Sequence, residues 1–289
     1  MKKMIILFTI VVILLVSSLI LFEKYKDEEE TEVVYSLNTN YAYLNNDSIN
    51  IIFKVYSNLE KSLLRYAKEA NVMLHDKNKE NVVTVVIEDS FISNTAIYDN
   101  RELYEYSLKT LIDITDFNIQ ECYLSLKFTN KEYVFYIGDL DVRKSNCLIN
   151  KLSIINLYGL SSENDISMSG IVVSLKNNKD KTIEISGVSV GGCYNVCLYE
   201  EDIEVKESTK IEYYISENMD VADSIRIYPG QTKTFIISLG KESDCYLYNN
   251  YILLNVDGIM CYIENFNYID SNDLEALRKY VKVGMIYEI

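Results

Sequence analysis

The sequence predicts a mostly β protein, in which an N-terminal transmembrane helix precedes two tandem β-sandwich domains and a short C-terminal helix. A long apolar run opens the chain, later segments alternate apolar and polar residues, and three segments of the first half recur in the second. The predicted limits are a cytoplasmic stub at 1–3, an anchor at 4–22, an acidic tether at 23–40, a first domain at 41–145 and a second domain at 146–289.

The anchor extends from Met4 to Phe22 without a charged residue. At about 1.5 Å of rise per residue, a helix of this length spans roughly the 30 Å hydrocarbon core of a bilayer. Lys2 and Lys3 precede the run, so the positive-inside rule keeps the N-terminus in the cytoplasm and places the rest of the chain outside. A cleaved signal peptide is the alternative, but its apolar region usually has about 7–15 residues. The length favours an uncleaved, single-pass anchor.

Period-two segments predict strands with one face on a core and the other toward water. The inward-facing residues of two such segments are Tyr106, Leu108, Ile112 and Ile114, then Cys122, Leu124, Leu126 and Phe128. Residues 59–70 differ, because their apolar residues recur at helical spacing after Ser57 and Glu60, which have the spacing of a capping box. The comparison of the two halves favours a strand there, so both alternatives stay open.

The two halves share three similar segments in the same order, at an offset that grows in small steps. This pattern is typical of a duplicated domain with loop insertions. The matching pairs are 51–58 with 171–178, 109–115 with 233–239, and the hairpin from Tyr123 with the hairpin from Tyr251.

The only proline of the chain lies in the dipeptide Pro229-Gly230, between two strand-like runs. Proline presets φ at the first corner of a type II turn and glycine accepts the positive φ of the second. This turn follows, at a distance, an apolar strand that ends in Asn177-Asn178. The combination resembles the prokaryotic surface immunoglobulin-like and CARDB-like domains, over about 120 residues of the second half. The resemblance implies an immunoglobulin-like β-sandwich and no particular chemistry.

The C-terminal tail is predicted to form a short helix, because Asn272 and Glu275 have the spacing of a helix cap.

An even number of cysteines on the oxidising side of a membrane favours disulfides. Free buried thiols and, less well supported, a four-thiolate zinc site are the alternatives, and six cysteines allow 15 connectivities. The candidate disulfide residues are Cys122, Cys147, Cys193, Cys197, Cys245 and Cys261.

The search for reactive groups finds no convincing catalytic, cofactor or metal site. His75, the only histidine, lies beside a polar turn and is expected to be a solvated loop residue. Asp139 and Asp141 lie on one face of a strand, as a glycosidase pair or a loose calcium site could, and Asp113 with Asp116 has the same limited potential. Charged strand ends usually just face water, and no phosphate-binding or dinucleotide-binding motif occurs.

The amino-acid composition limits the classes of molecule that this protein is expected to bind. With 28 basic and 43 acidic residues the formal charge is −15, so nucleic acid is excluded as a favoured partner. The 25 tyrosines suit strands, and the sugar-binding residue tryptophan is absent. The sequence therefore predicts a non-catalytic binding, adhesion or assembly protein that meets another surface or membrane protein and needs no cofactor. The alternatives are an accessory subunit of a membrane complex and, less favoured, a carboxylate-based envelope hydrolase.

Overall fold

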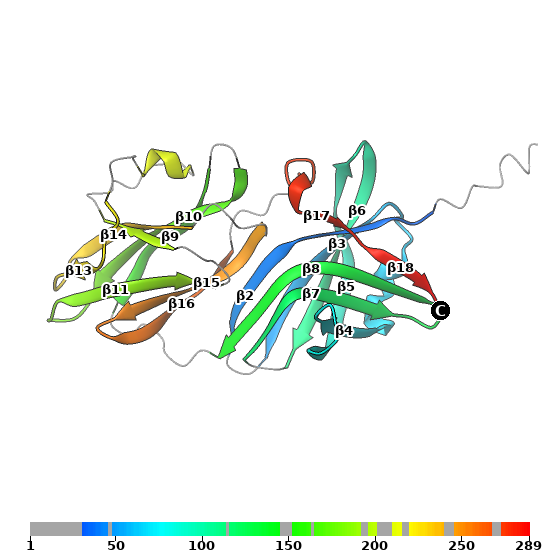
Figure 1. The fold of residues 1–289 in the computed structure, drawn as a ribbon, viewed down its shortest axis with the longest axis horizontal. Coiled ribbons are helices and arrows are strands. Elements are labelled where there is room, and N and C mark those ends of the chain that lie inside the picture. The colour runs from blue at the N-terminus through cyan, green and yellow to red at the C-terminus, as the bar shows by residue number, and fades with distance from the viewer. Residues whose placement is uncertain are drawn as a thin grey trace, which may run out of the picture. The chain divides into compact units, whose positions relative to one another are not determined.

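The fold is known from a computed structural model, which describes residues 31–45, 48–113, 116–144, 152–162, 165–191, 196–200, 210–215, 220–239, 246–267 and 273–289. Nearly all regular structure in these residues is β (Figure 1). The strands of the first half are β1 (Val34–Leu37), β2 (Thr39–Asn45), β3 (Ile49–Ser57), β4 (Asn71–His75), β5 (Val82–Tyr98), β6 (Arg101–Ile112), β7 (Phe117–Lys127) and β8 (Lys131–Lys144).

The second half contributes a further set of strands and the chain ends on two short ones. They are β9 (Leu152–Ser162), β10 (Asp165–Asn177), β11 (Ile183–Val190), β12 (Cys197–Tyr199), β13 (Ile225–Ile227), β14 (Thr232–Ser238), β15 (Tyr246–Val256), β16 (Ile259–Asn267), β17 (Val281–Val283) and β18 (Met285–Glu288). Three short 3-10 helices are described: η1 (Leu63–Glu69), η2 (Ile211–Tyr213) and η3 (Arg278–Tyr280).

The first sandwich has two sheets that share one long strand. In one sheet β1 pairs with β3 and β3 with β6; in the other β4 pairs with β7 and β7 with β8. The start of β5 pairs with β4 and its remainder with β6, so β5 crosses from one sheet to the other. Large apolar side chains, among them Phe53, Tyr106 and Phe135, are fully buried between the sheets. The inward half of the alternation predicted for β6 and β7 is confirmed, since Tyr106, Leu108 and Leu124 belong to this core. The other half is not, because Ser107 and Ser125, on the faces expected to meet water, are buried as well. Ile114 lies outside the described residues.

The second sandwich repeats this pairing order. There β9 pairs with β10 and β10 with β14, while β11 pairs with β15 and β15 with β16. These are the pairings of the A, B and E strands and of the C, F and G strands in immunoglobulin domains. In the first sandwich β1, β3 and β6 take the first set of positions and β4, β7 and β8 the second. Both halves are thus immunoglobulin-like in strand pairing, each with its own apolar core.

The N-terminal strand switches sheets at Asn38. β1 pairs antiparallel with β3, whereas β2 runs parallel to β8 and, at its start, parallel to the beginning of β15. Residues 34–40, which the sequence assigns to the tether, therefore form β1 and the start of β2. Their polar side chains misled the prediction: Ser36, Asn38 and Asn40 are buried in the structure.

The C-terminal strands return to the first sandwich. β17 pairs antiparallel with β1, and β18 pairs antiparallel with β8 (Figure 1). Because only Gly284 separates β17 from β18, this one stretch joins the two sheets, and the pairing around the first sandwich closes into a circuit. The first sandwich is accordingly built from residues 34–144 and 273–289, and the second sandwich is inserted between these two parts of the chain.

The predicted turn at Pro229-Gly230 is confirmed. Gly230 has a φ of +71°, and the amide of Gln231 donates to the carbonyl of Tyr228 at 3.0 Å, as in a type II turn. The fully buried Asn177 ties the turn to the end of β10: its amide nitrogen Nδ2 donates to the carbonyls of Lys181 and Ile227, at 2.8 and 2.9 Å. The two features that carry the resemblance to surface immunoglobulin-like domains are therefore in direct contact, because the Gly230 amide also donates to the Asn177 carbonyl.

Of the two alternatives left open for residues 59–70 the structure has the short helix, whereas the predicted C-terminal helix differs from expectation. In 59–70 the helix is the 3-10 helix η1, and its N-cap is Ser62, whose hydroxyl accepts from the amide of Leu64, while the Ser57 hydroxyl accepts from the amide of Leu59. The predicted C-terminal helix is a turn followed by η3. The reason is that Leu274, Leu277 and Tyr280 are buried at a spacing of three residues, which is the period of a 3-10 rather than an α-helix.

The anchor predicted at 4–22 lies outside the residues that the structure describes. Within the described ranges, no helix combines the length and the apolar character needed to cross a membrane.

Candidate functional site

The most concentrated group of polar side chains lies on the outer face of the first sandwich, across β3, β6 and β5. We call Lys54, Tyr56, Ser93, Glu105 and Ser107 the Glu105 cluster. The register places Tyr56 opposite Glu105 and Lys54 opposite Ser107. A β-bulge in β5 supplies the fifth member: Ile92 pairs with Tyr106 and Asn94 with Glu105, which leaves Ser93 as the extra residue. Bulges of this kind re-aim a side chain, here toward the carboxylate.

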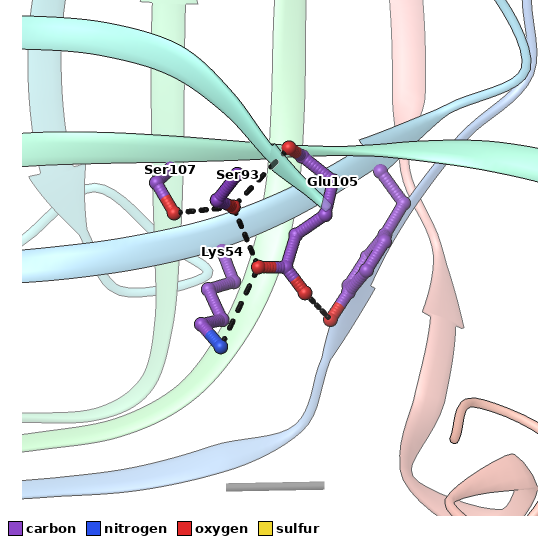
Figure 2. Close-up of polar contacts among 5 residues, drawn as sticks. Lys54, Ser93, Glu105 and Ser107 are labelled. Carbon is purple, nitrogen blue, oxygen red and sulfur yellow. Dashed lines mark hydrogen bonds and ion pairs between the residues drawn. The ribbon is translucent and has the colours of Figure 1, made fainter. Parts of the chain in front are cut away.

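The hydrogen bonds converge on Glu105 (Figure 2). The Ser107 hydroxyl donates to Ser93 Oγ at 2.8 Å, and Ser93 Oγ donates to Glu105 Oε1 at 2.6 Å. The hydroxyl of Tyr56 donates to Oε2 at 3.1 Å, and Lys54 Nζ lies 3.5 Å from Oε1. Glu105 is 2% exposed, so its charge is held in a buried site by one cation and two hydroxyl donors.

The Glu105 cluster is suited to stabilising the fold and not to catalysing a reaction. A general base needs access to the proton that it abstracts, yet both oxygens of the Glu105 carboxylate are occupied by partners from the same sandwich. A buried charge must be paired to persist, and here the pairing fixes the register of β3, β6 and the bulged part of β5.

His75 and Ser125 form a second polar pair, and these residue types could in principle act as a base and its nucleophile. The Nδ1–H group of His75 donates to the carbonyl oxygen of Asp76 at 2.7 Å, because a carbonyl can only accept, and Nε2 lies 2.8 Å from the hydroxyl oxygen of Ser125. Ser125 is fully buried and the ring stacks on Tyr123, 5.7 Å between centroids. The expectation that His75 is solvated was wrong, because its side chain, at the end of β4, is buried beside Tyr123 of β7 and meets the buried hydroxyl of Ser125.

The two carboxylates of the predicted pair on β8 bind different partners. Asp139 Oδ1 accepts from the amide of Glu121, at 2.9 Å. Asp141 accepts at Oδ2 from the hydroxyl of Tyr251, at 2.7 Å, and its Oδ1 lies 2.7 Å from Arg143 Nε. Burial, followed by the bond to Asp141, raises the pKa of the Tyr251 hydroxyl. The two carboxylates are thus engaged separately, Asp139 by the backbone of β7 and Asp141 by Tyr251 and Arg143.

The cysteine prediction needs a correction. Cys122 and Cys197 are free thiols, and no disulfide joins the described cysteines to one another. Cys122 points into the core of the first sandwich, and Cys261 is buried in the core of the second. Burial raises the pKa of the Cys122 thiol far above its usual range, which makes it a packed apolar group rather than a reactive one. Cys147, Cys193 and Cys245 lie outside the described residues.

The loose calcium candidates do not gather into a site. Asp113 and Asp116 are exposed, and no group of three or more histidine, cysteine or acidic residues in the described ranges could hold a metal ion.

Sequence reasoning missed the Glu105 cluster and the role of Tyr251. Glu105 lies in the alternating run of β6, where its polar neighbour Ser107 gives no hint of burial. The deciding fact is the bulge at Ser93, and a bulge shows only once two strands are placed in register. The partner of Tyr251 lies on β8, far away in the chain, so no local pattern links the two.

Comparisons with known proteins give little. No protein-family model matches the chain, and no curated protein matches it either. Two similar solved structures are one titled BspA_C_WT and the C-terminal domain of the Streptococcus agalactiae AgI/II polypeptide BspA. They are 10% and 9% identical over 80% of this chain and 98% and 97% of theirs, with TM-scores of 0.20 and 0.18. Scores this low carry no argument on fold or function, which rest on the strand pairing and the side-chain contacts.

Proposed function

We propose that this chain is a single-pass, membrane-anchored surface protein that carries two immunoglobulin-like sandwiches outside the membrane and binds another surface or membrane protein without catalysis. The proposal that the protein is not a catalyst rests on the contacts of its candidate reactive side chains. Glu105, His75 and Asp141 are each engaged by partners of the same chain. Such groups stabilise a scaffold, and binding is then left to loops and sheet edges.

The anchor is the sequence-based part of this proposal. The run Met4–Phe22 has the length of a membrane-spanning helix, and the lysines before it favour a cytoplasmic N-terminus. The test is protease treatment of intact cells that express the full chain with a C-terminal epitope. We expect the protein in the membrane fraction and the epitope to be lost to added protease.

The matched variants for this test are Leu14→Arg and Leu14→Ile. A charge at the centre of a spanning helix costs about 2.5–3.5 kcal/mol of insertion free energy, so Leu14→Arg should lower membrane retention while Leu14→Ile should not. A soluble, protease-shielded wild-type protein would overturn the proposed location.

The partner is identified by crosslinking the full chain at the membrane and analysing the captured proteins by mass. Recovery of one surface protein supports the binding function. Recovery of a fixed set of integral membrane proteins at constant stoichiometry would instead favour an accessory subunit of a membrane complex. The hydrolase alternative predicts envelope-polymer cleavage that disappears in Asp139→Asn and Asp141→Asn; we expect no cleavage by the wild-type protein.

A further inference from the structure

One face of the C-terminal stretch 281–289 carries apolar side chains that remain largely exposed. Gly284 and Ile286 face the core of the first sandwich, and the residues that alternate with them point the other way. These alternate residues, which we call the apolar stripe, are between 43% and 69% exposed: Val283, Met285, Tyr287 and Ile289.

The apolar stripe is a contiguous surface. The hydroxyl of Tyr287 donates to Sδ of Met285 at 3.0 Å, so these two side chains lie together. Single exposed apolar residues are normal on a soluble protein, whereas an apolar group of this kind marks a surface that contacts another phase or molecule. The stripe contains no charged side chain, and its tyrosine has the amphipathic ring that is favoured where an apolar phase meets water.

The first sandwich joins the N-terminal tether beside the apolar stripe. β1 begins at Val34, whose carbonyl accepts from the amide of Gly284 at 2.8 Å. β1 and β17 run side by side and antiparallel, with Tyr35 opposite Val283 (Figure 1). The chain that leads to the predicted anchor therefore enters the sandwich next to the stripe.

The length of that connection keeps the apolar stripe near the anchor. Only the eleven residues 23–33 separate Phe22, at the end of the predicted anchor, from Val34. Fully extended, they reach at most about 40 Å. A tether this short gives the stripe an effective concentration of about millimolar at the surface that holds the anchor, so contacts too weak to bind a free protein are sufficient here.

From these observations we propose that the apolar stripe rests on the bilayer that holds the chain's own anchor, at the boundary between headgroups and acyl chains. The tether brings this surface to the stripe in every copy of the protein. The formal charge of −15 gives no attraction to anionic headgroups, so apolar contact carries the binding. The inference rests on the proposed membrane anchor and adds a second contact between the protein and the same membrane.

The test uses the absence of tryptophan from the sequence, because a single introduced tryptophan then reports on one place only. The full-length Tyr287→Trp variant is reconstituted into vesicles of phosphatidylcholine, either unmodified or brominated near the headgroup end of the acyl chains. Bromine quenches tryptophan fluorescence on close contact. The matched control is Tyr228→Trp in the second sandwich, where the tyrosine is 59% exposed. We expect at least about threefold stronger quenching of Tyr287→Trp, unchanged by added salt because apolar contact is not screened.

Flotation of the same vesicles tests the anchor separately. A chain that does not float with the vesicles would overturn the anchor and the docking together. A chain that floats but shows equal quenching of the two variants would overturn the docking alone. A blue-shifted emission of Tyr287→Trp without quenching would indicate that another copy of the chain covers the stripe, and it would also overturn docking on the bilayer.

A second pair of variants tests whether the stripe itself makes the contact. In the Tyr287→Trp background, Ile289→Asn removes an apolar side chain from the stripe, and Ile259→Asn removes one from β16, where Ile259 is 52% exposed. We expect quenching to fall at least about twofold with Ile289→Asn and to stay unchanged with Ile259→Asn, because binding scales with the apolar area buried in the interface. Equal quenching in these two variants would contradict the proposal.

Discussion

The amide of Gly284 donates a hydrogen bond to the carbonyl oxygen of Val34, although these residues lie near opposite ends of the described chain. The contact sits where the two sheets of the first sandwich are joined by one strand. It requires the absence of a side chain, since a Cβ at position 284 would meet Val34 and Phe135 at short distance. Glycine at position 284 therefore lets this stretch pair with β1 without displacing the side chains of Val34 and Phe135.

We expect Gly284→Ala to lower the free energy of unfolding by about 1–3 kcal/mol, because the new Cβ must displace packed side chains. Urea unfolding followed by far-UV circular dichroism measures the change. The matched control is Gly187→Ala, where a Cβ would make only an ordinary 3.8 Å contact with Asn255. A control as destabilised as Gly284→Ala would show that the close approach of Gly284 to Val34 and Phe135 is unimportant.

Replacing the buried carboxylate tests the Glu105 cluster. Glu105→Gln keeps the shape but removes the charge that faces Lys54, and we expect a loss of about 1–3 kcal/mol in the free energy of unfolding. Glu88→Gln is the control, because the ion pair of Glu88 with Lys109 is more than one-third exposed and exposed pairs contribute about 0–1 kcal/mol. Similar losses in both variants would contradict the structural role assigned to Glu105.

Tyr251 gives stability a dependence on alkaline pH. Burial, and next the hydrogen bond to Asp141, raise the pKa of its hydroxyl above the ordinary value of 10.0. The protonated hydroxyl therefore stabilises the folded state fully below about pH 10, and this contribution is lost as the pH rises from there toward the raised pKa.

We expect Tyr251→Phe to be less stable than the wild type at pH 7, by about 1–3 kcal/mol, since Asp141 loses a donor. The difference should shrink above pH 10. Urea midpoints from pH 7 to 11 measure it, with the exposed Tyr228→Phe as a control that should change little. A constant difference across this range would refute the assignment.

The free thiols should differ in reactivity. Cys122 is fully buried with a raised pKa, whereas Cys197 is half-buried at the start of β12. We expect iodoacetamide to modify Cys197 at least about tenfold faster than Cys122 in the native protein, because the thiolate is the reactive form. Peptide mass mapping gives both rates, and urea should remove the difference. Rapid modification of native Cys122 would show that its strand opens readily.

Sequence reasoning succeeded where one strand or one turn decides the outcome. The alternation in β6 and β7 predicted which apolar side chains join the core, and Pro229-Gly230 predicted its turn. It failed where two distant segments meet. Ser125 alternates with the inward-facing Leu124 and Leu126, a position that alternation assigns to water, but it is buried against His75. Residues 34–40 were expected to form a tether but are bound by β3 and β8. In each case the contacting residue comes from a strand that is distant in the sequence. The register between two such strands decides the contact, and the hydrophobic periodicity of one strand does not predict that register.

The insertion of one sandwich within the other sets an order of assembly. During synthesis, residues 34–144 emerge first, but β1 and β8 must wait for 281–289 before their shared neighbour exists. The strands β9 to β16 are contiguous in the chain, so the later module has all its pairs at hand sooner and can finish earlier. A nascent chain stalled before residue 281 would thus display a completed inner module flanked by an unfinished outer one, and quality-control proteases would meet that exposed gap first.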